Sequence, residues 1–215
     1  MKKIVLFGGS FDPVHLGHTQ VAAAAAQYIC AEKTIFIPAR RSPLKMYPPS
    51  ASDIDRLEMI KLAIAGHENF EVSDCELKRQ LPSYTLDTVR KFQAACGDGG
   101  SIYWLVGADS IDELAHWYDV IELIDECNLA VMNRAGFDKP DFTGYEKLWG
   151  CRRIEKLQRN IVPTPLIDIS STDVRNRLAA GQEVAQMLNM AVLSYIRKHG
   201  LYKATPTENG DWCLS

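Results

Sequence analysis

Two histidines, His15 and His18, lie three residues apart just after a glycine-rich turn, and their imidazoles could donate hydrogen bonds to phosphate oxygens. The turn, Gly-Gly-Ser at 8–10, gives an anion close access to backbone N–H groups, because glycine carries no Cβ. The alanine-rich stretch 21–26 follows and strongly favours a helix. Unpaired N–H groups and the positive end of the dipole make the start of that helix favourable for phosphate. The pattern predicts a nucleotide phosphate site with donors for a charged transition state.

A second group of polar residues, Ser171, Thr172 and Arg175, lies near the other end of the chain. Hydroxyls and N–H groups at a helix start suit phosphate oxygens, and an arginine three residues after Thr172 lies on a similar face of that helix. Taken alone, these residues are better explained as an ordinary serine cap followed by a solvated arginine. Together with the two histidines, they favour a site for the β- and γ-phosphates of a nucleoside triphosphate.

Short apolar runs and helix-forming stretches alternate along the chain. Buried parallel strands are expected at 4–7, 34–37, 70–72, 102–106, 129–132 and 167–169. Helices are expected from the N-cap Ser52 to Gly66, from 82–85 to Gly97, from 170–172 to near Gly181, and over 190–199. The apolar face of the first of these helices is expected to start at Ile54. Residues 133–160 show no clear pattern.

Strands that alternate with helices predict an α/β fold: a single-domain, Rossmann-like parallel sheet, doubly wound, with helices on both faces. In such sheets, ligands bind beyond the carboxyl ends of the strands. The turn at 8–10, Asp109 and residues 170–172 each follow a predicted strand, so they are expected to converge on one crevice. Residues 1–203 are expected to form this domain, and residues 204–215 a polar C-terminal tail.

The composition of the chain excludes several classes of protein. Its 215 residues, 47% of them hydrophobic, suffice for one buried core. A net charge of −3 leaves no basic footprint for nucleic acid, and no apolar run reaches the length of a membrane-spanning helix. The apolar run 4–7 is too short for a secretory signal, and the six cysteines form no Cys-x-x-Cys pair, so zinc is not expected and the thiols should be reduced. We therefore expect a cytoplasmic protein that binds neither nucleic acid nor a membrane.

Two blocks of residues are similar to the motifs of a known superfamily. Residues 8–18, Gly-Gly-Ser-Phe-Asp-Pro-Val-His-Leu-Gly-His, resemble the first motif of the nucleotidyltransferases that carry a His-x-Gly-His motif. Residues 169–175, Ile-Ser-Ser-Thr-Asp-Val-Arg, resemble their C-terminal Ile-Ser-Ser-Thr-x-x-Arg motif. Two blocks in the expected order, about a domain apart, are far more specific than one glycine loop. Over residues 3–202 the chain resembles the bacterial nicotinate-nucleotide adenylyltransferases of this superfamily.

The resemblance implies an enzyme of NAD biosynthesis that uses Mg²⁺ and transfers AMP from ATP to nicotinate mononucleotide. The products would be nicotinate adenine dinucleotide (deamido-NAD) and pyrophosphate. Because the phosphate nucleophile already carries negative charge, such a site needs no general base. It must hold two anions in line and stabilise the charge that grows on the phosphoryl oxygens. Donors and cations without a Ser-His-Asp arrangement fit that requirement.

The resemblance also implies roles for individual residues. The implied catalytic residues are His15, His18, Lys45 and Arg175, with His18 the stronger candidate because it lies at the helix start. The implied ATP-binding residues are Gly8, Gly9, Ser10, Phe11, His18, Gly107, Asp109, Ser171, Thr172 and Arg175. Nicotinate mononucleotide would be bound by Thr85, Trp117, Tyr118 and Arg134. By the resemblance, Trp117 stacks on the pyridine ring, and Thr85 and the backbone of Tyr118 receive its carboxylate. Leu44, before Lys45, stands where the family commonly has a histidine.

Simpler explanations exist for several of these residues, and other functions stay open. Trp117 could be a core residue, Asp109 a helix cap, and Lys45 and Arg134 surface charges. The nearest alternative function is a sister adenylyltransferase that acts on phosphopantetheine or nicotinamide mononucleotide; the segments around Thr85 and Trp117 argue against phosphopantetheine. From a different class, the chain could be a nucleotide sensor without catalysis, although the intact histidines and arginine of the two motifs argue against it. The oligomeric state is not determined by the sequence.

Overall fold

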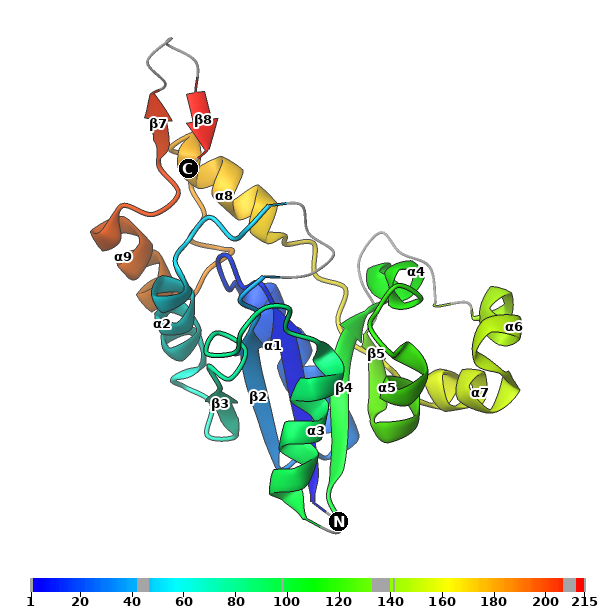
Figure 1. Ribbon diagram of the computed structural model, residues 1–215. Helices are drawn as coiled ribbons and strands as arrows, with labels where there is room; N and C mark the ends of the chain where they lie inside the picture. The colour runs from blue at the N-terminus through cyan, green and yellow to red at the C-terminus, as the bar shows by residue number, and fades with distance from the viewer. Residues whose placement is uncertain are drawn as a thin grey trace.

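The computed structural model describes residues 2–41, 47–97, 99–132, 140, 142–206 and 212–214. Its centre is a six-stranded parallel sheet with the strand order β3-β2-β1-β4-β5-β6 (Figure 1). The strands are β1 (Lys3–Gly9), β2 (Lys33–Pro38), β3 (Phe70–Val72), β4 (Ser101–Gly107), β5 (Asn128–Met132) and β6 (Ile161–Val162). The winding direction reverses between β1 and β4, which is where open α/β sheets bind their ligands.

Alternating side chains in the strands explain why both faces of the sheet are covered. In β1, Val5 and Phe7 belong to one buried cluster, and Ile4 and Leu6 to the other, because successive side chains of a strand point to opposite faces. The helices that pack into the first cluster are α1 (Leu16–Ile29), α2 (Asp53–Ile64), α8 (Ser171–Ala179) and α9 (Met190–His199). Those of the second are α3 (Thr85–Cys96), α4 (Ile111–Leu114), α5 (Val120–Glu126), α6 (Glu146–Trp149) and α7 (Cys151–Arg159).

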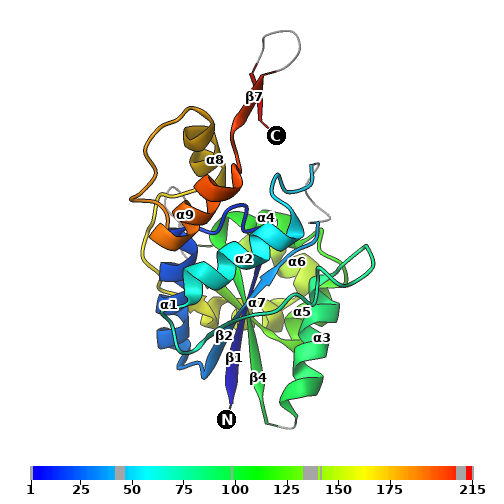
Figure 2. The ribbon, with the colours of Figure 1, turned by 90° about the vertical axis from the view of Figure 1, so that its left-hand side faces the viewer.

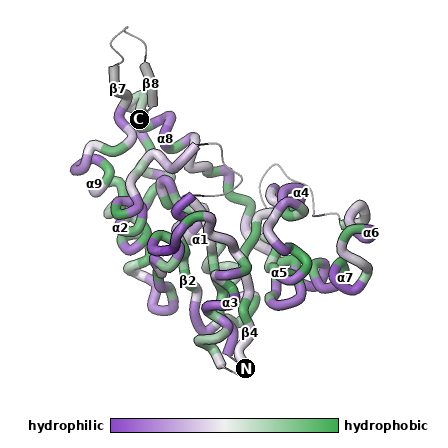
Figure 3. Tube along the Cα trace, in the orientation of Figure 1, coloured by the Kyte–Doolittle hydropathy of each residue, from purple (hydrophilic) through white to green (hydrophobic). Residues whose placement is uncertain are grey.

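The views agree with this two-layered covering. Figure 2 shows α1 and α3 on opposite sides of β1 and β4. In Figure 3, hydrophobic and hydrophilic residues alternate along α3 and α9, as expected for helices with one face on the sheet and the other in water. The predicted doubly wound α/β fold is confirmed. No helix in the described part of the chain is long and apolar enough to cross a membrane.

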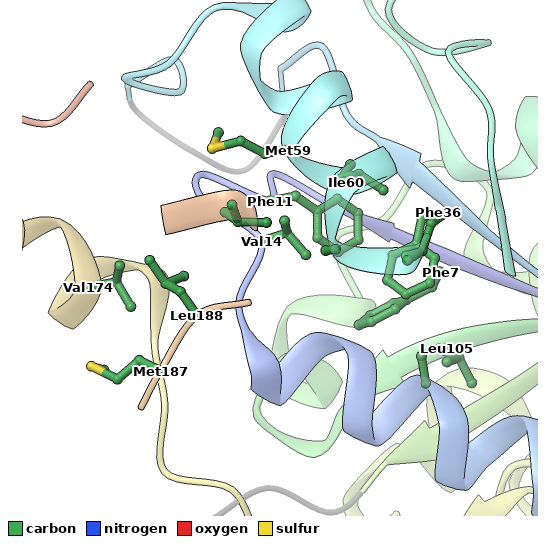
Figure 4. Close-up of a cluster of buried hydrophobic side chains, with 14 of the residues drawn as sticks. Phe7, Phe11, Val14, Phe36, Met59, Ile60, Leu105, Val174, Met187 and Leu188 are labelled. Atoms are coloured by element: carbon green, nitrogen blue, oxygen red, sulfur yellow. The ribbon is translucent and has the colours of Figure 1, made fainter. Parts of the chain in front are cut away.

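The C-terminal helices are joined to the sheet by side chains that surround the loop after β1. Val174, Met187 and Leu188 pack in the same cluster as Phe11 and Val14 (Figure 4). In addition, the N–H at the first residue of α1 donates a 2.9 Å hydrogen bond to the carbonyl of Met187. The start of α1 is therefore held between the central strand and the C-terminal segment.

The last strand lies earlier in the chain than the pattern predicted. Residues 167–169 are not a strand; the sheet ends with β6, and residues 163–170 lead to α8 without regular structure. Pro163 and Pro165 lack the N–H group that a sheet ladder needs, so pairing stops at Val162. The prediction that a strand delivers residues 170–172 was therefore wrong, although the loop brings them to the same cleft.

Helix α2 begins as predicted but buries a different face. Ser52 caps it, because the Ser52 hydroxyl accepts a 3.1 Å hydrogen bond from the backbone N–H of Asp55. Ile54, expected to face inward, is 78% exposed, whereas Arg56, Met59 and Ile60 are buried. The prediction that the buried face of α2 starts at Ile54 was therefore wrong. The buried face starts at Arg56, whose guanidinium lies inside the protein.

Two further parts of the chain had no predicted structure. In the stretch 133–160, a 3₁₀ turn (Thr143–Tyr145) leads into α6 and α7, and the ring of the buried Trp149 stacks on Tyr145 with centroids 4.5 Å apart. Near the C-terminus, β7 (Ala204–Pro206) and β8 (Trp212–Leu214) form an antiparallel pair. The division into a domain at 1–203 and a tail at 204–215 stays a prediction.

Candidate active site

A cleft of about 1040 Å³ opens beyond the carboxyl ends of β1 and β4. It brings together most of the residues that the two motifs and the resemblance predicted: Gly8, Gly9, Ser10, Phe11, His15, His18, Thr85, Gly107, Asp109, Trp117, Tyr118, Ser171, Thr172 and Arg175. Lys45 and Arg134 lie outside the described residues. Segments from both motif blocks and from the region between them thus meet at the switch point of the sheet.

The glycines at the end of β1 are required by their neighbours. A Cβ on Gly8 would lie 2.3 Å from Cζ2 of Trp104, and one on Gly9 would lie 3.2 Å from Cζ of Phe11. Phe11 itself has a φ of 48°, in the left-handed region, and its ring is 2% exposed. The ring packs edge-on against His18, with centroids 5.0 Å apart, so it supports that imidazole.

Replacing Gly8 by alanine should therefore destabilise the protein through overpacking. We expect the free energy of unfolding to fall by about 1–3 kcal/mol, the usual cost of forcing an extra methyl group into a packed site. The control is Gly66→Ala, where a Cβ meets no atom within 4 Å among the described residues. Denaturant titration of both variants measures the difference, and an equal loss in the two would contradict the role given to Trp104.

The two histidines are arranged by the helix start itself. His15 is the N-cap of α1, and its backbone N–H donates to Nδ1 of His18 over 3.2 Å. Because Nδ1 accepts this bond, the proton of neutral His18 lies on Nε2, which makes Nε2 the donor. The two imidazole rings lie 3.7 Å apart between centroids. Gly17 makes room for them, since a Cβ there would lie 3.0 Å from Cε1 of His15.

Asp12, between the glycine turn and His15, is the centre of a buried network that the sequence reasoning missed. Asp12 is 4% exposed, and its carboxylate accepts hydrogen bonds from Ser50 N–H (2.7 Å), Ala51 N–H (3.0 Å) and the Tyr202 hydroxyl (2.8 Å). Burial and the charge of Asp12 raise the pKa of Tyr202, so its hydroxyl stays a donor. The network ties the first loop to two segments that are distant in sequence.

Arg175 connects α8 to the same loop. Its Nη1 donates to the carbonyl of Asp12 over 2.7 Å, and its Nη2 donates to the hydroxyl of Thr172 over 3.3 Å. The Ser171 hydroxyl donates to the carbonyl of Pro13 over 2.9 Å. The hydroxyls of Ser171 and Thr172 therefore hold the helix start in place. Ser170 Oγ caps the N–H of Asp173, and the N–H groups of Ser171 and Thr172 have no acceptor within the helix.

Burial of Arg56 was not predicted, because the apolar spacing that starts at Ile54 assigns the buried face of α2 to other residues. The Arg56 side chain is fully buried; Nη1 donates to the carbonyl of Ser10 and Nη2 to the carboxylate of Asp53, both over 2.6 Å. A carbonyl held in this way cannot turn toward an anion, so the turn is left to present its N–H groups. The spacing of Arg56 was the sequence signal for its burial, because it lies three and four residues before the apolar Met59 and Ile60.

The opposite wall of the cleft carries the aromatic residues. Thr85 is the first residue of α3, and Trp117 and Tyr118 follow α4. The rings of Tyr84 and Tyr118 stack with centroids 4.1 Å apart and 17° between their planes, which joins the two segments. The indole N–H of Trp117 is buried without an acceptor among the described residues. This wall, which we call the ring subsite (Thr85, Trp117 and Tyr118), offers flat aromatic surfaces and the indole N–H of Trp117 as a donor.

A hydrogen-bonded polar network that includes Glu76 and Arg79 lies next to the ring subsite. Glu76 is 5% exposed and accepts a 2.7 Å hydrogen bond from the hydroxyl of Thr88. Arg79 donates from Nη1 to Ser83 Oγ, Tyr84 O and Thr88 Oγ1, at 3.1, 3.3 and 3.0 Å. Burial raises the pKa of Glu76 to about 7, although Thr88 and Arg79 favour its charged form. Neither Glu76 nor Arg79 was predicted, because nothing in their local pattern distinguishes them from solvated charges.

The fold and the cleft define a nucleotide-binding α/β protein, and comparison with known proteins identifies its class. A model of the cytidylyltransferase-like family matches residues 6–177, from within β1 into α8. The chain belongs to the cytidylyltransferase-like family.

Within this family, the chain is similar over nearly its whole length to nicotinate-nucleotide adenylyltransferases. It is 36% identical over 211 residues to a protein of Chromobacterium violaceum, covering 94% of this chain and 99% of that protein. It is 38% identical over 203 residues to one of Neisseria meningitidis, covering 94% and 100%. Both are named "Probable nicotinate-nucleotide adenylyltransferase".

Among solved structures, the fold is similar to that of "Plasmodium falciparum nicotinic acid mononucleotide adenylyltransferase complexed with NaAD". The TM-score is 0.74 and the identity 20%, and the match covers 94% of this chain and 98% of the other. The resemblance that the two motif blocks indicated is confirmed.

Proposed function

We propose that this cleft transfers AMP from ATP to nicotinate mononucleotide and forms nicotinate adenine dinucleotide and pyrophosphate, a step of NAD biosynthesis. The observation that carries the proposal is the meeting of two helix starts, with His18 and Arg175, and an aromatic wall in a single cleft. An oxygen of the mononucleotide phosphate attacks the α-phosphorus of ATP, a new P–O bond forms, and the bond to pyrophosphate breaks. The attacking oxygen is already anionic, so no side chain has to remove a proton.

The histidine side of the cleft is suited to the phosphate that is transferred. The N–H on Nε2 of His18 and backbone N–H groups of the loop that follows β1 would donate to the oxygens of the α-phosphate. Charge on these oxygens increases in the transition state, so donors fixed beforehand stabilise it without reorganisation. The Nδ1 bond from His15 fixes the ring for this purpose.

The start of α8 is suited to the leaving pyrophosphate. Arg175, only 24% exposed in its side chain, and the N–H groups of Ser171 and Thr172 would hold the β- and γ-phosphates. Holding both ends of the triphosphate aligns the bond that breaks with the oxygen that attacks. Asp109 lies just after the end of β4, where its carboxylate would accept a hydrogen bond from a ribose hydroxyl. Gly107 leaves room for this carboxylate, because a Cβ at Gly107 would lie 2.3 Å from Oδ1 of Asp109.

The ring subsite is suited to the mononucleotide. Trp117 would stack on the electron-poor pyridine ring, and Thr85 with the backbone N–H of Tyr118 would donate to the carboxylate. Because α3 starts at Thr85, the positive end of its dipole also favours an anion there.

Mg²⁺ belongs to the proposal as part of the substrate, bound to the triphosphate. Members of the wider family generally use a divalent metal with ATP. No three His, Cys, Asp or Glu side chains in the described part of the chain are placed to hold a metal ion, and the carboxylate of Asp12 is occupied by its three donors. The phosphate oxygens and water would therefore supply the ligands. We also propose a cytoplasmic location, in keeping with the free cysteines among the described residues.

Replacing Arg175 by alanine should weaken ATP binding. We expect a loss of about 1.5–3 kcal/mol, typical of a hydrogen bond to a charged group, so the KM for ATP should rise roughly 10- to 100-fold. The control is Arg177→Ala on the same helix, whose side chain is 41% exposed and ion-paired with Asp173. Steady-state kinetics at saturating mononucleotide measure both, and an unchanged KM and turnover in Arg175→Ala would refute the assignment.

The proposed function is tested by offering the purified protein ATP and Mg²⁺ with nicotinate mononucleotide, nicotinamide mononucleotide or phosphopantetheine in turn. Pyrophosphate release and the mass of the organic product are followed together. The expected result is a dinucleotide from nicotinate mononucleotide. Binding of ATP without any product would instead indicate a nucleotide sensor.

A further inference from the structure

One buried ionisable group lines the cleft without a part in the proposed chemistry. Glu76 lies in the segment between β3 and α3 and faces the cleft beside Ser83, Tyr84 and Thr85. A carboxyl group close to a site for a carboxylate is an unfavourable neighbour if both are charged. The charge of Glu76 would therefore influence whether the site binds a ring that carries a carboxylate.

The contacts place Glu76 close to the ring subsite. The Thr88 hydroxyl donates to Oε1 of Glu76 over 2.7 Å. Thr88 is three residues after Thr85 on α3, and side chains at this spacing are about 5–6 Å apart at Cβ. The Glu76 carboxyl therefore lies within roughly 10 Å of the group expected to bind the ring substituent.

We propose that Glu76 is a specificity-determining residue of the ring subsite: its carboxyl admits the carboxylate of nicotinate while uncharged and repels that carboxylate, but not a carboxamide, once it ionises. This inference rests on the function proposed above. The Thr88 hydroxyl that donates to Glu76 also accepts a hydrogen bond from Arg79 Nη1, which in turn bonds Ser83 Oγ. Thr88, fixed in this way on the first turns of α3, holds the Glu76 carboxyl next to the ring subsite.

The charges around Glu76 set the pH range of this effect. Burial raises its pKa to about 7; Thr88 and Arg79 favour ionisation, and Asp87 on α3 opposes it. Glu76 is thus mainly neutral at pH 6 and mainly charged at pH 8.5. A bound carboxylate would raise its pKa further, so binding of nicotinate mononucleotide takes up protons near pH 7.5.

The experiment measures the ratio of kcat/KM for nicotinate mononucleotide to that for nicotinamide mononucleotide from pH 6 to 8.5. The two mononucleotides carry the same phosphate, and both reactions use the same ATP and the same histidines. The effect of titrating those groups therefore cancels in the ratio. In the wild type we expect the ratio to fall roughly tenfold across this range, as for two like charges about 10 Å apart at an effective dielectric constant of about 20. In Glu76→Gln, which keeps an acceptor for Thr88, the ratio should stay constant at the wild-type value of pH 6.

The matched control is Asp87→Asn, which removes the same charge from an exposed position on the first turn of α3. Its ratio should still fall with pH, over a range displaced slightly to lower pH because Asp87 no longer opposes ionisation of Glu76. A constant ratio in the wild type, or an equal decline in Glu76→Gln, would overturn the inference, and so would a constant ratio in Asp87→Asn. Formation of dinucleotide from neither substrate would overturn the proposed function, and the inference with it.

A second measurement on the wild type does not depend on the folding of a variant. Calorimetric titration at pH 7.5 in buffers of different ionisation enthalpy gives the protons taken up on binding each mononucleotide. We expect nicotinate mononucleotide to take up roughly half a proton more than nicotinamide mononucleotide. Equal uptake would contradict a charge-sensitive Glu76.

Discussion

Replacing His18 by alanine is expected to lower turnover by roughly two to four orders of magnitude while the protein stays folded, the effect of removing a preorganised donor from a growing charge. The fold should survive, because the substitution leaves only one N–H at the start of α1 without its acceptor, at a cost of about 1 kcal/mol. Pyrophosphate release measures turnover, and thermal melting measures the fold.

Two further variants sharpen this test. His18→Asn retains an acceptor near the position of Nδ1 but not the donor at Nε2, so it should be as slow as the alanine variant. His67→Ala removes an imidazole that stacks on Phe70 outside the cleft, and it should keep wild-type turnover. Turnover of His18→Ala within a few-fold of the wild type would remove His18 from the mechanism.

The second large effect concerns the choice between acid and amide. Nicotinate mononucleotide should exceed nicotinamide mononucleotide in kcat/KM by at least ~10²-fold at pH 6–7, since a carboxamide leaves donors of a carboxylate site mismatched. Replacing Trp117 by alanine should weaken both substrates alike, because stacking does not distinguish an acid from an amide. Replacing Thr85 by valine should narrow the gap only modestly, since the backbone donors remain.

Steady-state kinetics with each mononucleotide, at saturating ATP and Mg²⁺, decide this second prediction. Equal efficiency on the two substrates would indicate a dual-specificity enzyme and would leave adenylyl transfer itself standing. Trp117→Ala could instead lower kcat/KM for nicotinate mononucleotide and leave that for nicotinamide mononucleotide unchanged. That result would show that the indole N–H, which has no acceptor among the described residues, contacts the carboxylate.

The parts of the fold that could be predicted are those in which neighbouring residues decide the structure. The side chains of residues 4–7 point alternately into the two buried clusters, so the apolar run predicted this strand. The Ser52 hydroxyl accepts a hydrogen bond from the N–H of Asp55, three residues later, so the local sequence also predicted this helix start. The false strand at 167–169 shows the limit of this reasoning. Two isoleucines matched a strand pattern, but the prolines at 163 and 165 ended the pairing before them.

The candidate site could be predicted where a motif kept its spacing, and not where distant side chains complete it. The two blocks around His18 and Arg175 were evident. Asp12 lies inside the first block, but its role depends on the N–H groups of Ser50 and Ala51 and on the hydroxyl of Tyr202, which no local pattern connects to it. Burial of Arg56 and Glu76 depends in the same way on tertiary packing, which overrides the usual exposure of charged residues.

The hydrogen bond from Tyr202 to Asp12 has a consequence for the protein during its synthesis. The two residues are 190 positions apart, so the loop that carries the first histidines is translated long before its last partner. At about 5–20 residues per second, roughly 10–40 seconds pass between the two. During this time the nascent chain lacks the Tyr202 hydroxyl that donates to the Asp12 carboxylate. The network around Asp12 can therefore be completed only after residue 202 has left the ribosome.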